Sequence, residues 1–471
     1  MLNFKKSTSI MLVVLMVLAL SMTAIANPAA FDRGITSQVD IDRMMDHLSY
    51  LSEDIGVRVA STPEEKESAD WIAGVFEEYG YEAEIQEFEF INRVAYLTMT
   101  EPEEMQIDVQ IGGSRLESHP AAAPLTTEEG ITATVVDCGF GNVDEFPEEV
   151  EGNIALIKRG QNTFVNMLAR AEAAGATAVL IQNNDWRIFK VNVTGASIPY
   201  ATMNDEAGEL LRGEEEVIVN LQTLQYDTSQ NVIATRKPNN KNRDTGNVVV
   251  YSAHYDSVPT APGASDNGTG VVGLLELARI LSSMPIDTEV RFLAAGAEEV
   301  GLVGSRYYVS QLSEEEKGTI VANYNMDMIG TAGEAQTHLY VNTLDGDNLV
   351  SRTAREAAER LGYGDMIIAP FHRGASDHVA FFEAGIAAAN FIYRCPETAA
   401  LEPWYHQPYD TIDRVSPERL QTAVEIVAAA SYDVIRPETP NLIRSNIRRD
   451  TIRPVDVEYQ DNEATVKIPE M

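Results

Sequence analysis

Cysteine is scarce in this chain. Cys138 and Cys395 are the only two among 471 residues, which excludes a framework of several disulfides. The two thiols either pair in an oxidising compartment or stay apart as buried side chains. The sequence leaves both alternatives open, because it does not show whether the two residues lie close together.

Basic residues are also few relative to acidic ones. The chain has 35 Lys and Arg residues against 72 Asp and Glu residues, which gives a formal net charge of −37. A field of this sign repels nucleic acid and anionic membranes and favours cationic ligands such as peptide amino termini. Most of this negative charge is explained by a simpler role, which is to keep an exported protein soluble. We therefore expect no nucleic-acid partner and no stable membrane association.

Long apolar runs are missing after the amino-terminal segment. Residues 1–26 are typical of a secretory signal, with Lys5 and Lys6 before a short apolar stretch and small residues before a cleavage site. The stretch is too short to cross a bilayer comfortably. We expect the mature protein to be secreted and extracellular, with association with a cell wall as an alternative.

Three common hydrolase motifs are absent. The chain has no Gly-x-Ser-x-Gly elbow, no His-Glu-x-x-His helix and no Gly-Lys-Ser/Thr phosphate loop. These absences disfavour a serine hydrolase, a helix-bound single-zinc protease and a nucleotidase.

The length and the apolar pattern predict two domains, because one hydrophobic core rarely serves 471 residues. Helical periodicity over Ile41–Leu51 and Ala69–Tyr79 precedes an alternating strand at Tyr81–Phe90. From Asn92 the pattern changes to short strands and turns, with one helix at Phe164–Ala174. The predicted divisions are a signal at 1–26, a first piece of the larger domain at 36–91, an insertion at 92–224, a second piece at 225–436 and an extension at 437–471.

Strands and helices alternate after the insertion. Short apolar runs of parallel-sheet character at Asn247–Ser252, Glu289–Ala295 and Val321–Asp327 are separated by helical segments. The pattern predicts an α/β fold with a mixed, mostly parallel sheet between two layers of helices. In such folds the ligand crevice lies outside the carboxyl ends of the strands. The predicted helices are Gly270–Ser283, Gly304–Leu312 and Asp347–Leu361, with a further strand at Phe391–Tyr393.

Potential metal ligands follow these strands. Imidazole and carboxylate donors without thiolates suit zinc, and two ions about 3.5–4 Å apart need a bridging carboxylate. Asp266 is the best bridge, because it lies in a Gly-rich turn before a helix. The pattern assigns His254 and Asp327 to one ion and Glu299 and His406 to the other.

Other side chains receive supporting roles. Glu298 is the candidate general base, and Tyr405 is the candidate donor to the developing oxyanion. Asp256 is expected to accept the second N–H of His254, and Asp410 to act similarly for His406. A lone His-x-Asp or Glu-Glu pair is more often structural, so the hypothesis depends on the ordered set. For His378 we expect a supporting or packing role rather than metal binding.

Together these motifs resemble those of the secreted and vacuolar-type double-zinc aminopeptidases. Within the insertion, Gly152–Gly160 and Ala169–Asn184 resemble a protease-associated domain. The resemblance implies a zinc-exopeptidase fold with a mainly-β insertion, two zinc ions, peptide or protein amino termini as substrates, and the same residue roles. It also implies a cis peptide between Asp266 and Asn267. The matching segments are His254-Tyr255-Asp256-Ser257, Gly263-Ala264-Ser265-Asp266-Asn267-Gly268, Ala297-Glu298-Glu299-Val300-Gly301-Leu302, Asn325-Met326-Asp327, Ser376-Asp377-His378 and Tyr405-His406-Gln407-Pro408-Tyr409-Asp410-Thr411.

Two other functions remain as alternatives. A glutamate-carboxypeptidase-like enzyme shares the metal centre and the insertion, but it needs cationic groups that hold a free carboxylate. Arg373 and Arg394 are the candidates for that role, and they form no evident cluster in the sequence. The other alternative is a noncatalytic protein in which the insertion binds a partner.

Overall fold

The computed structural model describes residues 28–109, 124–189, 191, 193, 196–213 and 216–436. The predicted signal at 1–26 and the predicted extension at 437–471 lie outside the described residues. No helix in the described part of the chain is long and apolar enough to cross a membrane.

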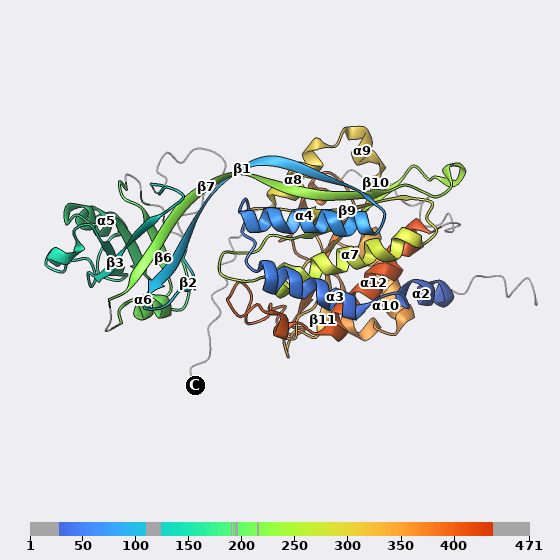
Figure 1. Cartoon of the computed structure of the whole chain (residues 1–471). Helices are drawn as coiled ribbons and strands as arrows, with labels where there is room; N and C mark the ends of the chain where they lie inside the picture. The colour runs from blue at the N-terminus through green and yellow to red at the C-terminus, as the bar shows by residue number, and fades with distance from the viewer. Residues whose placement is uncertain are drawn as a thin grey trace, which may run out of the picture.

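Two lobes are joined by a long antiparallel ribbon (Figure 1). Strands β1 (Glu82–Glu101) and β7 (Ile218–Arg236) pair from one lobe into the other, with an irregular register between Glu89 and Asn92. The predicted strand at Tyr81–Phe90 is therefore only the first half of β1. The predicted boundaries at 92 and 224 fall within the ribbon, so the chain passes between the lobes along continuous strands.

The larger lobe contains a mixed sheet in the order β12-β11-β13-β10-β8-β9-β7. Its central pairs, β13 with β10, β10 with β8, and β8 with β9, are parallel, whereas β11 with β13 and β9 with β7 are antiparallel. The predicted mixed, mostly parallel sheet is confirmed. The strands are β8 Val248–His254, β9 Glu289–Ala295, β10 Ile320–Met326, β11 His338–Thr343, β12 Ile367–His372 and β13 Ala388–Arg394.

Helices cover both faces of this sheet. Alternate residues of β8 show the two faces, because Val249 and Tyr251 pack into one core cluster whereas Val248 and Val250 pack into another. Burial on both faces explains why these strands are continuously apolar rather than alternating. One layer contains α2 (Pro28–Thr36), α3 (Ile41–Ser49), α4 (Pro63–Glu78), α7 (Thr269–Ser283), α10 (Leu349–Leu361) and α12 (Pro417–Ile435), and α8 (Val303–Gln311), α9 (Glu314–Thr319) and α11 (His378–Glu383) are the other helices of this lobe.

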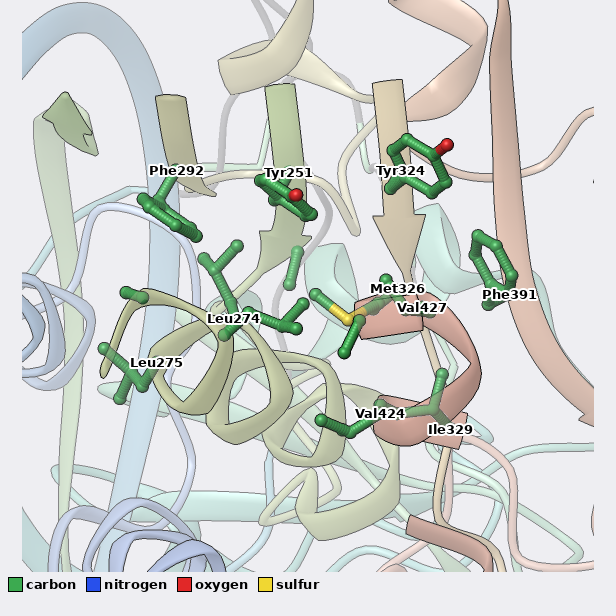
Figure 2. Packing of buried hydrophobic residues seen from close by; sticks show 14 of the residues in the cluster. Tyr251, Leu274, Leu275, Phe292, Tyr324, Met326, Ile329, Phe391, Val424 and Val427 are labelled. Carbon is green, nitrogen blue, oxygen red and sulfur yellow. The ribbon is translucent and has the colours of Figure 1, made fainter. Parts of the chain in front are cut away.

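The main core lies between the sheet and helices α7 and α12. Figure 2 shows aromatic rings of neighbouring strands lying side by side above Leu274 of α7 and Val424 of α12. The ring centroids of Tyr251 and Phe292 are 5.1 Å apart, and those of Tyr251 and Tyr324 are 5.8 Å apart. This packed layer holds the strands in place. The predicted ligands lie at the carboxyl ends of the same strands.

The smaller lobe is built mainly from strands, as the resemblance implies for the insertion. Its buried strands form parallel pairs, and β3 continues the sheet from β7. Cys138 lies in its core, whereas Cys395 is buried in the larger lobe, and both are free thiols. The elements are β2 Met105–Ile107, β3 Ile131–Asp137, β4 Ile154–Lys158, α5 Phe164–Ala173, β5 Ala178–Gln182, β6 Tyr200–Met203 and α6 Asp205–Leu211.

Candidate metal centre

The fold brings the predicted ligands to one edge of the sheet. His254 is the last residue of β8, Glu299 follows β9, and Asp327 follows β10. Asp266 lies in the turn that leads into α7, where the peptide to Asn267 is cis, as the resemblance implies. His406 comes from the loop after β13. Residues separated by up to 152 positions thus meet because parallel strands end at the same edge.

Asp266 lies between two sets of donors. Its Oδ1 is 3.3 Å from Nε2 of His254, and that nitrogen is 3.8 Å from Oδ1 of Asp327. Its Oδ2 is 3.2 Å from Nε2 of His406, which is also 3.2 Å from Oε2 of Glu299. Each oxygen of Asp266 therefore faces a different imidazole, and each imidazole has a carboxylate of its own.

The donor atoms fit bound cations. Oδ1 of Asp327, Oε1 of Glu299 and Nε2 of His406 are buried and make no hydrogen bond to the described residues. Buried polar atoms normally have hydrogen-bond partners, so carboxylate oxygens and an imidazole nitrogen without such partners fit the binding of cations. Ligands about 2.0–2.1 Å from a tetrahedral zinc ion lie roughly 3.3 Å apart, close to the separations found here.

Glu298 also lies close to these donors. A carboxylate oxygen of Glu298 is within 4.8 Å of ligand atoms of both His254 and Asp327. Burial raises the pKa of Glu298 well above its usual range, and the neighbouring Glu299 carboxylate adds to the increase. For Asp266, burial opposes ionisation, but His254 and His406 outweigh it and hold its pKa below the usual range. The two acids are therefore placed in opposite electrostatic environments.

The carboxylate of Asp256 holds the main chain of the Glu-Glu pair. Its Oδ1 accepts a hydrogen bond from the N–H of Glu298 at 3.0 Å, and its Oδ2 accepts one from Glu299 at 3.1 Å. Nδ1 of His254 lies 3.1 Å from the carbonyl oxygen of Asp256 and 3.5 Å from its carboxylate. Asp256 thus supports the imidazole through its carbonyl oxygen and, at a longer distance, its carboxylate, which also orients Glu298 and Glu299.

Asp410 supports the bridging residue. Its two oxygens accept hydrogen bonds from the N–H groups of Ser265, at 2.7 Å, and Asp266, at 3.0 Å. The prediction that Asp410 orients the His406 imidazole was therefore wrong. The chain turns between His406 and Asp410, and the Asp410 carboxylate points to the Asp266 loop. Sequence spacing does not show this long-range contact.

Two other residues also lie at this edge. The ring of Tyr405 stacks on His406, with centroids 3.7 Å apart, and burial raises the pKa of its hydroxyl well above the usual range. His378 is buried, its Nε2 lies 3.1 Å from the carbonyl oxygen of Arg373, and it belongs to neither donor set. This arrangement fits the packing role expected for His378.

Sequence reasoning missed three buried residues beside the site. Arg58 and Glu65 are completely buried, and Glu402 accepts a hydrogen bond from Oγ of Ser265 at 3.0 Å. Glu65 in particular resembles an ordinary acidic residue in the first turn of a helix. None of the three belongs to a motif, and only the tertiary fold shows their position.

Glu65 carries a stability prediction. Its carboxylate accepts hydrogen bonds from the N–H groups of Ser61 (2.6 Å) and Ala297 (3.2 Å) and from Oγ of Ser229 (2.7 Å). In a Glu65→Gln variant, the NH2 group of the amide replaces one of the two accepting oxygens. It then faces an N–H or O–H group that can no longer donate its hydrogen bond. We expect the free energy of unfolding in urea to fall by about 1–3 kcal/mol. Glu67→Gln, on the exposed face of the same helix, is the control and should change it by less than about 0.5 kcal/mol; equal stability of both variants would contradict the prediction.

A mixed α/β sheet with imidazole and carboxylate donors at its carboxyl edge, joined to an inserted lobe, defines a metallohydrolase of the exopeptidase type. The chain belongs to peptidase family M28, whose model matches residues 231–431, and it carries a PA domain matched over residues 131–211. The aminopeptidase YwaD of Bacillus subtilis is 41% identical over 407 residues, covering 85% of this chain and 86% of that protein. The family resemblance drawn from the motifs is confirmed.

Solved structures agree with this assignment. The structure of BSAP, a zinc aminopeptidase from Bacillus subtilis, has a TM-score of 0.61 at 40% identity and covers 84% of this chain and 96% of that one. The aminopeptidase from Aneurinibacillus sp. strain AM-1 has a TM-score of 0.57 at 32% identity, covering 86% and 96%. These relatives are named aminopeptidases, the activity that the motifs predict.

Proposed function

We propose that this chain is a secreted zinc aminopeptidase that binds two zinc ions and releases amino-terminal residues from peptides. The observation that carries the proposal is the position of Asp266, whose two oxygens face separate pairs of donors. His254 and Asp327 would hold one ion, and Glu299 and His406 the other. Zinc ions held there would supply Lewis acidity, which would polarise the peptide carbonyl and lower the pKa of the attacking water.

Glu298 acts as the general base in this proposal. Its neighbour Glu299 serves as a ligand, while the main chain of both is fixed by Asp256. The Glu298 side chain is thereby free to take a proton from the attacking water and to deliver it to the departing amine. Burial of this carboxylate favours its uptake of a proton.

Tyr405 and the surrounding charge complete the proposed chemistry. The raised pKa of Tyr405 keeps its hydroxyl protonated, so that it can donate a hydrogen bond to the oxygen that gains charge in the transition state. The protonated amino terminus of a peptide is a cation, and the net charge of −37 favours its approach.

The space beside Glu299 suits a peptide substrate. A cavity of about 430 Å³ lies between the lobes and includes Glu299 in its wall. Apolar residues of both lobes line it, among them Val59 and Val258 from the larger lobe and Leu97 and Ile107 from the smaller one. Pockets of this size and character commonly hold small ligands and side chains.

The direction of cleavage separates this proposal from a carboxypeptidase. We expect the protein to hydrolyse aminoacyl-anilides and peptides with a free amino terminus, and to leave amino-acetylated versions of the same substrates essentially intact. The reason is that the cationic terminus is what the acidic site would recognise. Product analysis by mass spectrometry measures the outcome. Removal of carboxyl-terminal residues from the blocked peptides would favour the carboxypeptidase, and no turnover of any substrate would favour a binding protein.

A further inference from the structure

Arg58 is a buried arginine whose guanidinium is bound entirely by main-chain carbonyls. The side chain is 0% exposed. Nε donates to the carbonyl oxygen of Tyr255 at 2.8 Å, and Nη2 donates to that of Gly263 at 2.9 Å. Nη1 lies within hydrogen-bonding distance of three more carbonyl oxygens, those of Leu51 (3.0 Å), Gly56 (2.7 Å) and Pro262 (2.6 Å).

These contacts join the end of β8, which carries His254, to the turn that contains Asp266. Tyr255 directly follows His254, and Gly263 begins the turn that contains Asp266. The main chain of Arg58 adds to the junction, because its N–H donates to Oγ of Ser257 at 2.9 Å and its carbonyl accepts from the N–H of Ser257 at 3.0 Å. A single planar side chain thus sets the distance between the two segments.

The junction is tightly packed. Gly263 has a φ of +63°, and a Cβ at this position would lie 2.5 Å from the carbonyl oxygen of Asp266 and 2.9 Å from Nη2 of Arg58. The close approach of the guanidinium to the turn therefore requires glycine. Because the guanidinium and the turn are in such close contact, we expect small movements of Arg58 to be transmitted to the Asp266 turn.

The charge of Arg58 also faces the acidic site. Burial lowers its pKa to about 10, and the nearby carboxylates of Asp410, Asp256 and Asp266 oppose this decrease. The guanidinium therefore stays protonated at neutral pH. It is a fixed positive charge behind a cluster of carboxylates, and it does not occupy the donor atoms that face the metal position.

We propose that Arg58 is a positioning residue for the zinc centre, which holds the end of β8 at His254 and the Asp266 turn at the separation that both donor sets require. This inference rests on the proposed zinc function. Arg58 does not contact the reacting atoms; it acts through the main chain of Tyr255 and Gly263. Lysine cannot replace it, because an ammonium group offers three donors at one point whereas the guanidinium offers five donors spread over a rigid fork.

The test compares zinc affinity and kinetics in an Arg58→Lys variant. We expect zinc affinity, measured by competition with a chromogenic chelator on the metal-free protein, to fall by about 10–100-fold, as for other residues that orient metal ligands. At saturating zinc we expect kcat to fall, with a smaller change in KM, because misplaced ligands affect the transition state more than peptide binding. Near-UV circular dichroism checks that the variant is folded.

Arg360→Met is the matched control. Arg360 is a half-buried arginine on α10 that pairs with Asp32 at 2.7 Å and Asp433 at 2.6 Å, away from the ligand loops. Its loss should lower the melting temperature without changing zinc affinity. A general destabilising effect would instead lower zinc affinity in both variants, and that result would overturn the inference.

A second variant covers the case in which Arg58→Lys does not fold. Ser257→Ala removes only the hydroxyl that accepts the main-chain N–H of Arg58, and we expect a several-fold loss of zinc affinity, in line with one hydrogen bond. Zinc affinity and kcat equal to wild type in the folded Arg58→Lys variant, or in Ser257→Ala if the lysine variant does not fold, would overturn the inference. Failure of the wild-type protein itself to bind zinc would instead overturn the proposed function.

Discussion

A Glu298→Gln variant is expected to lose about 10²–10⁴-fold in kcat while it retains the zinc content of the wild-type protein. Glutamine has nearly the same shape as glutamate but accepts no proton at neutral pH. The hydrogen bond that places residue 298 is donated by its main-chain N–H to Oδ1 of Asp256, so the substitution leaves it in place. Steady-state kinetics on an aminoacyl-anilide and metal analysis of the same preparation measure the two quantities.

Glu299→Gln provides the contrast to this prediction. Oε2 of Glu299 lies 3.2 Å from Nε2 of His406, and we assign Glu299 to the metal. This variant should bind zinc more weakly and recover part of its activity when zinc is added in excess, whereas Glu298→Gln should not respond. Loss of zinc from Glu298→Gln would make Glu298 a ligand rather than the base, a role that its proximity to His254 and Asp327 also permits.

The strands that carry the site were predictable from the sequence because they are buried on both faces. A strand in this position is continuously apolar, and the polar residue that ends the run marks the carboxyl edge. The predicted strand at Glu289–Ala295 has the same bounds as β9, and the prediction at Val321–Asp327 is shifted by one residue from β10. Parallel pairing then places the residues after each strand side by side without further information.

Helix starts and the inter-lobe ribbon were less predictable. Helix α4 begins at Pro63, six residues before the predicted Ala69, because Thr62 caps it by accepting the N–H of Glu65 and because proline suits the first turn. Strand β1 continues beyond Phe90 because it pairs with β7, more than one hundred residues later in the chain. Such pairing stabilises a strand whose own sequence gives no clear signal of its end.

The supporting contacts of the site were not predictable, because they join residues with no shared motif. Asp410 reaches the main chain of Asp266 across 144 positions, and Arg58 reaches Gly263 across 205. A main-chain N–H or carbonyl group can make such a hydrogen bond whatever side chain its residue carries, so these contacts produce no paired motif in the sequence. Motifs therefore indicate which donors can bind metal, whereas the contacts that hold those donors in place become visible only in the folded chain.

Removal of metal is expected to abolish peptide hydrolysis and to destabilise the fold around the site. The acidic groups Asp266, Glu298, Glu299 and Asp327 lie within a few ångströms of two imidazoles, and without bound cations only these two imidazoles offset the mutual repulsion of the carboxylates. A ligand that binds only the folded state also raises its stability in proportion to the logarithm of ligand concentration over Kd. Treatment with a chelator should therefore eliminate anilide hydrolysis and lower the melting temperature.

Titration of zinc into the metal-free protein then tests the number of ions. Because Asp266 faces two separate donor sets, activity and melting temperature should rise until two equivalents of zinc per chain have been added. The control is the same chelator saturated with zinc beforehand, which should leave both quantities unchanged. Saturation at one equivalent would contradict the shared role of Asp266, and hydrolysis that persists in the metal-free protein would contradict the metal-dependent mechanism as a whole. The two results are distinguishable, because only the second leaves activity before any zinc is added.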